Sequence, residues 1–177
     1  MTVICNYAGK VRAEGKEQVS GKSVTSPISR PNLELMRRSD TVETPKSEKE
    51  KLDLINGTIR YLSKDRGCKK VGAVGFCNGA AWVIRALSNN PGVARVDTGF
   101  VAHPANVTAN LLQGVQGPLS VASADDDAIQ TQDRRFQSEN ILKQNGWPYK
   151  ISLYSHLRHG FAVRRAVLTK AEVYAKK

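Results

Sequence analysis

The chain has 177 residues, the size of one domain, and 40% of them are hydrophobic, which is enough to form a core. Its formal net charge at pH 7 is +11, but the basic residues are spread along the chain and form no block of five. A charge of this size attracts polyanions weakly and in a salt-sensitive way. Without a basic motif it predicts no specific nucleic-acid-binding function, and a solvated basic surface is the simpler interpretation.

Cysteine usage and hydropathy indicate the compartment. The three cysteines, Cys5, Cys68 and Cys77, match no zinc-binding spacing, and their odd number argues against a disulfide framework. The chain opens with no signal-peptide core, and no apolar run in it is long enough to span a membrane. We therefore expect a cytoplasmic protein without a membrane partner, and the sequence carries no prediction of its oligomeric state.

The first 46 residues show little pattern. Residues 2–7 have the composition of one short strand, but the apolar residues after them follow no period of 2 or 3.6. Pro27, Pro31 and Pro45 interrupt the stretch. We expect residues 1–46 to be an irregular or disordered basic N-terminal extension.

Regular structure is predicted to begin at Ser47, which opens a domain over residues 47–177. Ser47 and Glu50 have the spacing of a capping box, S-x-x-E, at the start of a helix. Apolar residues at helical spacing follow and make one face: Leu52, Ile55, Ile59 and Leu62. Gly67 is a plausible C-terminal stop for this helix.

Residues 71–88 predict a strand, a sharp turn and a helix. The apolar strand, 71–76, runs into a G-x-C-x-G sequence formed by Gly75, Cys77 and Gly79. This is the nucleophile-elbow arrangement with cysteine in place of serine, in which flanking glycines relieve a strained backbone. A cysteine at a helix N-terminus is favoured as a thiolate. An inert buried cysteine in a tight turn is the alternative interpretation.

Further strands and helices alternate along the rest of the chain. Strands are predicted at 96–102, 119–122 and 149–154, helices at 80–88 and 130–144, a loop at 155–161, and the start of a helix at 168–177. In the helix at 130–144, the inward residues are expected to be Phe136, Ile141 and Leu142. This alternation predicts the α/β class, with a mostly parallel sheet flanked by helices.

Candidate chemistry follows three predicted strands. Cys77, Asp127 and His159 each come just after a strand, where open α/β sheets place their sites. Their order along the chain, nucleophile, acid and histidine, is the order of α/β-hydrolases.

Other residues of the same types compete for two of these positions. Asp125 and Asp126 are alternatives to Asp127, and His103 and His156 are alternatives to His159. A histidine at a strand end before a proline is expected to be a packing residue, so His103 is interpreted as structural. His156 is interpreted as a surface loop residue.

The chain resembles the dienelactone hydrolases of the α/β-hydrolase superfamily, in particular the fungal-type members, over about residues 48 to 175. The residues that carry the resemblance are VGFCNG at 74–79, AHP at 102–104, GPLS at 117–120, ADDDAI at 124–129, Arg135 with Ser138 and Glu139, and HGFAVR at 159–164.

The resemblance implies a hydrolase of small lactones and activated esters that uses a Cys-Asp-His triad. It assigns Cys77 as the nucleophile, His159 as the general base and Asp127 as the acid that orients the histidine. It favours Asp127 over its neighbours because that residue aligns with the acid of the family. The backbone N–H of Asn78 is implied as an oxyanion donor. Neither a metal nor an organic cofactor is implied.

Family members are longer than this chain, so the resemblance predicts a partial α/β-hydrolase fold that is incomplete at both ends. Two alternatives to an active hydrolase therefore stay open. One is a truncated, catalytically inactive remnant of the family. The other is a polyanion-binding protein driven by the net charge of +11, whose affinity would fall steeply with salt.

Overall fold

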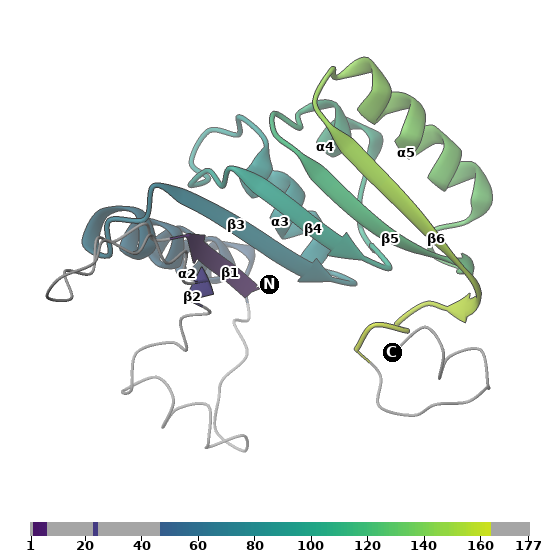
Figure 1. Ribbon diagram of the computed structural model, residues 1–177, viewed down its shortest axis with the longest axis horizontal. Helices are drawn as coiled ribbons and strands as arrows, with labels where there is room; N and C mark the ends of the chain where they lie inside the picture. Colours follow the sequence, from purple (N-terminus) through teal and green to yellow (C-terminus); the bar gives the residue numbers. More distant parts are fainter. Residues whose placement is uncertain (1, 7–22, 25–46, 164–177) are drawn as a thin grey trace, which may run out of the picture. The chain divides into compact units, whose positions relative to one another are not determined.

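A computed structural model describes residues 2–6, 23–24 and 47–163 of the chain (Figure 1). The chain divides into two units, Val3–Val71 and a second unit of residues Met1–Thr2 and Gly72–Lys177. The helix expected at 168–177 and most of the predicted extension, 7–22 and 25–46, lie outside the described residues.

Strand β1, Thr2–Asn6, confirms the short strand expected at the N-terminus. It pairs antiparallel with β2, Ser23–Val24, which the sequence did not predict. Two residues of a strand are too few to show an alternating pattern.

The first helix begins where its capping box predicts. Helix α2 spans Glu48–Arg60 and continues as a short π-helix, η1, over Tyr61–Asp65. The Glu50 amide donates to Ser47 Oγ at 3.1 Å, and the Ser47 amide donates to Glu50 Oε2 at 3.1 Å, so two donors at the helix start are satisfied. The predicted stop, Gly67, has a φ of 64°. Just beyond it, Cys68 is buried and disulfide-bonded, in contrast to the expectation drawn from the odd number of cysteines.

Four parallel strands form the sheet that begins with the elbow strand. They are β3, Lys70–Phe76, β4, Thr98–Ala102, β5, Leu119–Asp126, and β6, Tyr149–Arg158, paired in that order. The predicted α/β class with a mostly parallel sheet is confirmed. Because all four strands run the same way, their carboxyl ends meet at one edge of the sheet (Figure 1).

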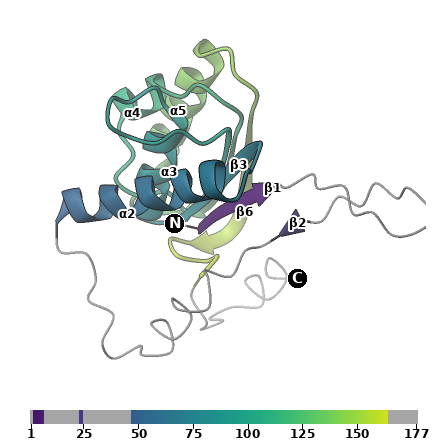
Figure 2. The ribbon, with the colours of Figure 1, turned by 90° about the vertical axis from the view of Figure 1, so that its left-hand side faces the viewer.

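Three helices lie on one face of this sheet (Figure 2). They are α3, Gly79–Leu87, α4, Ala109–Gln113, and α5, Gln132–Gln144. Helix α3 approaches the sheet closely at Gly99, where a Cβ would lie 2.9 Å from Val83 Cγ1 and 3.3 Å from Leu87 Cδ2. The sequence predicted α3 and α5 but not α4, because five residues are too short to show a helical period.

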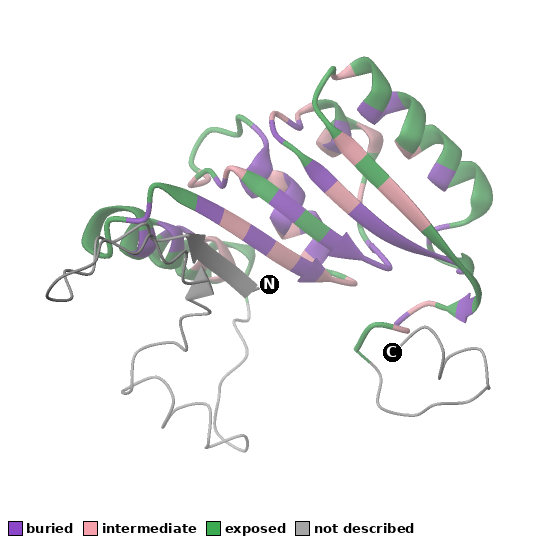
Figure 3. Ribbon diagram, in the orientation of Figure 1, coloured by how far each residue is buried: buried purple, intermediate pink, exposed green. Residues whose placement is uncertain are grey.

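The core lies between α3 and the first three strands of this sheet. Val83, Ile84 and Leu87 on α3 and Val101 on β4 are at most 1% exposed. In Figure 3 the purple, buried positions gather on β3, β4, β5 and α3, whereas β6 is mostly pink and green.

Helix α5 departs from its predicted inward face at one position. Ile141 and Leu142 are buried as expected, but Phe136 is 51% exposed and Arg135 is buried in its place. Arg135 lies seven residues before Leu142, which is two helical turns, so these two share a face and Phe136 does not. The expectation for Phe136 was wrong because it was drawn from residue type without the helical period.

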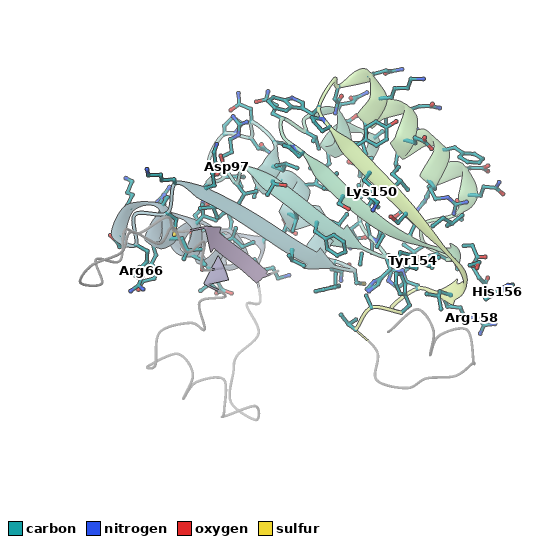
Figure 4. The ribbon with its side chains drawn as sticks, viewed as in Figure 1. Arg66, Asp97, Lys150, Tyr154, His156 and Arg158 are labelled. Carbon is teal, nitrogen blue, oxygen red and sulfur yellow. The ribbon has the colours of Figure 1, made fainter. Side chains whose placement is uncertain are left out.

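Strands β5 and β6 run further than the sequence predicts. Strand β5 includes the acidic residues Asp125 and Asp126, and β6 includes residues 155–158 of the predicted loop. The extra length is paired, because Asp126 lies opposite Arg158 after a bulge between Ala124 and Asp126. Figure 4 labels His156 and Arg158 on this last part of β6. The sequence did not predict this part of the strands, because exposed polar residues lack the hydrophobic alternation on which strand prediction depends.

Within the part of the chain that the structure describes, no helix combines the length and apolar character needed to cross a membrane.

Candidate active site

Cys77 sits in the turn between β3 and α3, so the predicted strand, turn and helix are all present. Its φ of 50° is in the left-handed region, which is unusual for a non-glycine residue. The Cys77 amide donates to the carbonyl of Ala102 at 3.2 Å, and its own carbonyl accepts from Ala80 at 3.0 Å and Ala105 at 3.1 Å. These hydrogen bonds hold the strained backbone, and Cys77 itself is a free, partly exposed thiol.

Gly75 of the elbow lies too close to the start of α3 to carry a side chain. A Cβ on Gly75 would contact the carbonyl oxygen of Gly79 and would lie 2.6 Å from the carbonyl carbon of Gly79 and 2.7 Å from Val83 Cγ2. Any side chain at Gly75 would therefore push the start of α3 away from β3. Since Cys77 lies between these two glycines, that shift would displace the thiol.

His159 follows β6 and reaches Cys77 across the carboxyl ends of the strands. Its Nε2 lies 3.1 Å from Cys77 Sγ. Its Nδ1 lies 2.9 Å from Asp127 Oδ2 and 3.1 Å from Asp127 Oδ1. The side chain of His159 is 13% exposed and that of Asp127 is 0% exposed. Thiol, imidazole and carboxylate thus form one continuous, largely buried chain.

The electrostatics of Asp127 favour a charged carboxylate. Burial by itself raises the pKa of Asp127, but the amides of Gln130 and Ile129 and the ring of His159 donate to it, and together they lower the pKa below its ordinary value. The Ile129 and Gln130 amides lie 2.8 Å and 3.0 Å from Asp127 Oδ1. An ionised Asp127 accepts a hydrogen bond from Nδ1–H of His159. The other ring nitrogen, Nε2, then carries no proton and can accept one from the thiol.

The competing aspartates are not part of this chain of hydrogen bonds. Asp126 is exposed and pairs with exposed Arg158, whose Nε lies 3.0 Å from Asp126 Oδ2. Asp125 is also exposed. Burial raises its pKa, while backbone hydrogen bonds, chiefly from His156 and Leu157, outweigh that and lower it. Of the three aspartates, the structure brings Asp127 alone to His159 among the described residues.

The competing histidines differ from each other. His156 is exposed on β6, in line with its interpretation as a surface residue, although it lies within a strand and not in a loop. His103 is 0% exposed, and its ring centroid lies 5.0 Å from that of His159. Sequence reasoning missed this contact. The signal was present, because His103 directly follows β4, the strand between those that lead to Cys77 and Asp127.

Asn78 occupies the first position after Cys77 and precedes α3. Backbone N–H groups in the first turn of a helix have no acceptor within the helix. The side chain of Asn78 does not cap α3; its Oδ1 instead accepts from Asn106 Nδ2 at 2.7 Å.

The arrangement as a whole can activate a nucleophile. An imidazole that is oriented by a carboxylate can act as a base toward the thiol beside it, and the helix start beside the thiol can hold negative charge. The residues that the structure describes contain no group of three or more His, Cys, Asp or Glu side chains suited to hold a metal ion.

The sequence matches one protein family over most of its length. The model of the family described as the dienelactone hydrolase family matches residues 29–177, well over half of the chain. The chain belongs to the dienelactone hydrolase family. The match begins upstream of Ser47, and the domain boundary predicted there stays a prediction.

Three fungal relatives share sequence with this family member. A hydrolase of Talaromyces stipitatus is 46% identical over 97 residues, 55% of this chain and 37% of the relative. One of Aspergillus violaceofuscus is 39% identical over 111 residues, 63% of this chain and 44% of the relative. A dienelactone hydrolase of Gibberella moniliformis is 27% identical over 166 residues, 92% of this chain and 62% of the relative. The chain thus spans 37 to 62% of the length of these relatives.

Solved structures show the same fold. An esterase of Pyrococcus furiosus superposes with a TM-score of 0.52 at 18% identity, covering 64% of this chain and 54% of the esterase. The acylaminoacyl peptidase of Pyrococcus horikoshii superposes with a TM-score of 0.51 at 15% identity, covering 64% of this chain and 24% of the peptidase. This dienelactone hydrolase family member therefore has part of an α/β-hydrolase fold, as its sequence predicts.

Proposed function

We propose that the chain is a hydrolase of small lactones or activated esters, with Cys77 as nucleophile, His159 as general base and Asp127 as orienting acid. The observation that carries the proposal is the continuous contact from Cys77 Sγ through His159 to Asp127, at 3.1 Å and 2.9 Å. Membership of the dienelactone hydrolase family supports the reaction class.

The first half of the reaction forms a thioester. His159 Nε2 takes the proton of Cys77, and Sγ attacks the acyl carbon of the substrate. The negative charge moves to the carbonyl oxygen, for which we propose the Asn78 backbone N–H as one donor. When the intermediate collapses, the bond to the alcohol oxygen breaks and His159 returns the proton to that oxygen. For a lactone, the freed hydroxyl stays attached to the acyl chain.

The second half releases the acid. His159 removes a proton from water as the water oxygen attacks the thioester carbon. The carbon–sulfur bond then breaks to give the carboxylic acid, and His159 returns its proton to Sγ, which restores the thiol. Asp127 stays ionised and holds the Nδ1 proton of His159 throughout, so the imidazolium formed in each half is stabilised.

The other parts of the proposal follow from this chemistry. The partner is a small-molecule ester or lactone, with no specific nucleic acid and no membrane. A cytoplasmic location would keep the nucleophilic thiol reduced, whereas the disulfide at Cys68 is of a kind that is rare in that compartment. The alternative is an inactive member of the family. The observation that favours it is that the chain spans 37 to 62% of the length of its relatives.

The test is hydrolysis of p-nitrophenyl acetate by the purified chain beside Cys77→Ala, with circular dichroism of both. We expect turnover in the wild type and its loss in the variant with an unchanged spectrum. Asp126→Asn is the control for a substitution beside the site and should keep the wild-type rate. A folded wild type whose turnover equals that of Cys77→Ala would refute the proposal and leave the inactive alternative.

A further inference from the structure

His103 occupies a strained, buried position between the strands that carry the site. It directly follows β4 and is 0% exposed. Its amide donates to the carbonyl of Ala122 on β5 at 2.8 Å, which continues the pairing of the two strands. Its φ of 36° is in the left-handed region, where a non-glycine residue is held only by its surroundings. Such strain often accompanies a functional role.

The His103 ring touches aromatic rings from both sides of the site. The Phe76 ring, directly before Cys77, lies 6.1 Å away at an interplanar angle of 32°. The ring of His159 lies 5.0 Å away at 72°, and that of Phe161 lies 5.5 Å away at 71°. One side chain therefore contacts the general base, the residue before the nucleophile and a residue after the base.

The hydrogen bonds of His159 restrain its ring only in part. They act at Nδ1 and Nε2, so together with the Cβ–Cγ bond they leave small turns about the line that joins Asp127 to Cys77 as the least restrained motion of the ring. A ring packed edge to face against the imidazole opposes that turn, because T-shaped aromatic contacts depend on orientation. Among the described residues, His103 makes such an edge-to-face ring contact with His159.

We propose that His103 is a positioning residue, which fixes the ring plane of His159 and its distance from Cys77 through edge-to-face contact. The inference rests on the proposed function, because it assigns a role within the same site. Phe161 also packs edge to face against His103 and is itself in contact with Tyr154 of β6, at 5.4 Å and 38°. The ring contacts thus tie the ends of β3, β4 and β6 to one another.

The principal test compares His103→Ala with Val101→Ala. Val101 is 1% exposed on β4, two residues before His103, so its truncation weakens packing without removing a ring contact of His159. Two rates are measured on folded protein: hydrolysis of p-nitrophenyl acetate and alkylation of Cys77 by iodoacetamide, which reports how well His159 activates the thiol. We expect His103→Ala to lower kcat and the alkylation rate by roughly 10- to 100-fold, with KM nearly unchanged, since small misplacements of catalytic groups have effects of this size.

A packing role alone gives a different result. In that case Val101→Ala and His103→Ala would both lose stability, and both would keep kcat and the alkylation rate within about twofold. That result would overturn the proposal. If the wild type has no Cys77-dependent turnover, the proposed hydrolase function fails, but the alkylation rates still decide whether His103 positions His159.

Three further variants cover the case in which His103→Ala does not fold. Phe161 is partly exposed, so Phe161→Leu should fold and lower the alkylation rate through its loss of contact with His103. His103→Phe keeps a flat ring and His103→Leu does not. We expect Phe at this position to retain the alkylation rate within about threefold and Leu to lower it by about tenfold or more. Equal rates for the Phe and Leu variants would contradict the proposal.

Discussion

The strands β3 to β5 and the strand β6 contribute to the same site from very different surroundings. The first three are packed under α3, whose residues Val83 and Leu87 are 0% exposed, and they supply Cys77 and Asp127. Strand β6 supplies His159 and is mostly exposed, with Leu153 at 51% and Tyr154 at 37%. Cys77 and Asp127, the proposed nucleophile and acid, are therefore held by the core, while His159, the proposed base, depends on a few specific contacts. The two regions should respond differently to the same chemical change.

The largest effect is expected where the two regions meet, at Asp127. Asp127→Asn keeps the shape of the side chain but presents its amide to His159, so the histidine loses the partner that fixes its tautomer. By analogy with serine proteases, kcat should fall by about 10³- to 10⁴-fold. Steady-state kinetics with p-nitrophenyl acetate measure this, and Asp126→Asn serves as the matched control. A loss of less than about tenfold would mean that His159 does not rely on this carboxylate.

Leucine truncation compares the two regions directly. Leu87 is 0% exposed on α3, and Leu153 is 51% exposed on β6. Leu87→Ala should cost about 2–5 kcal/mol of unfolding free energy, because it removes buried area and leaves a cavity. Leu153→Ala should cost under about 0.5 kcal/mol, as surface substitutions do. Urea denaturation followed by circular dichroism gives both values. Similar costs would mean that β6 is covered in solution.

The stability of the chain should depend on pH through Asp127. Burial raises the pKa of this carboxyl, but its hydrogen bonds hold it below the ordinary value of 3.8 in the folded protein. The folded state therefore binds fewer protons than the unfolded state in acid. The contribution of Asp127 is complete above about pH 3.8 and is lost as the pH falls through the lower folded pKa.

Urea midpoints between pH 7 and pH 3 test this dependence. The wild type should lose more stability in acid than Asp127→Asn, which has no carboxyl to protonate. Equal losses in the two proteins would assign the acid sensitivity to other groups.

The smallest effect is expected at the exposed ion pair that joins the end of β6 to β5. The side chains of Arg158 and Asp126 are 76% and 69% exposed. Surface ion pairs of this kind contribute about 0–1 kcal/mol. Arg158→Gln should therefore change the unfolding free energy by less than about 0.5 kcal/mol and leave kcat unchanged. A clear loss of activity would indicate that the pair holds the end of β6, and with it His159, in place.

The same contrast explains what the sequence could predict. The elbow around Cys77 and the helix start at Ser47 depend on residue types at fixed short spacings, so both were predicted almost to the residue. The last part of β6 was predicted as a loop because an exposed strand with polar residues carries no hydrophobic alternation. The contact between His103 and His159 was missed: the place of His103 after β4 indicated that it lies near the site, but the ring geometry that joins residues far apart in the chain is not written in their spacing.

The spacing of the site along the chain has a consequence for how the protein assembles. The Asp127 turn closes within three residues, whereas the contact between Cys77 and His159 joins residues 82 apart. Closing a long loop costs more entropy and takes longer than forming a local turn. During refolding, the helical signal should therefore return before the contact between Cys77 and His159 forms. The recovery of catalysis should lag behind the recovery of structure.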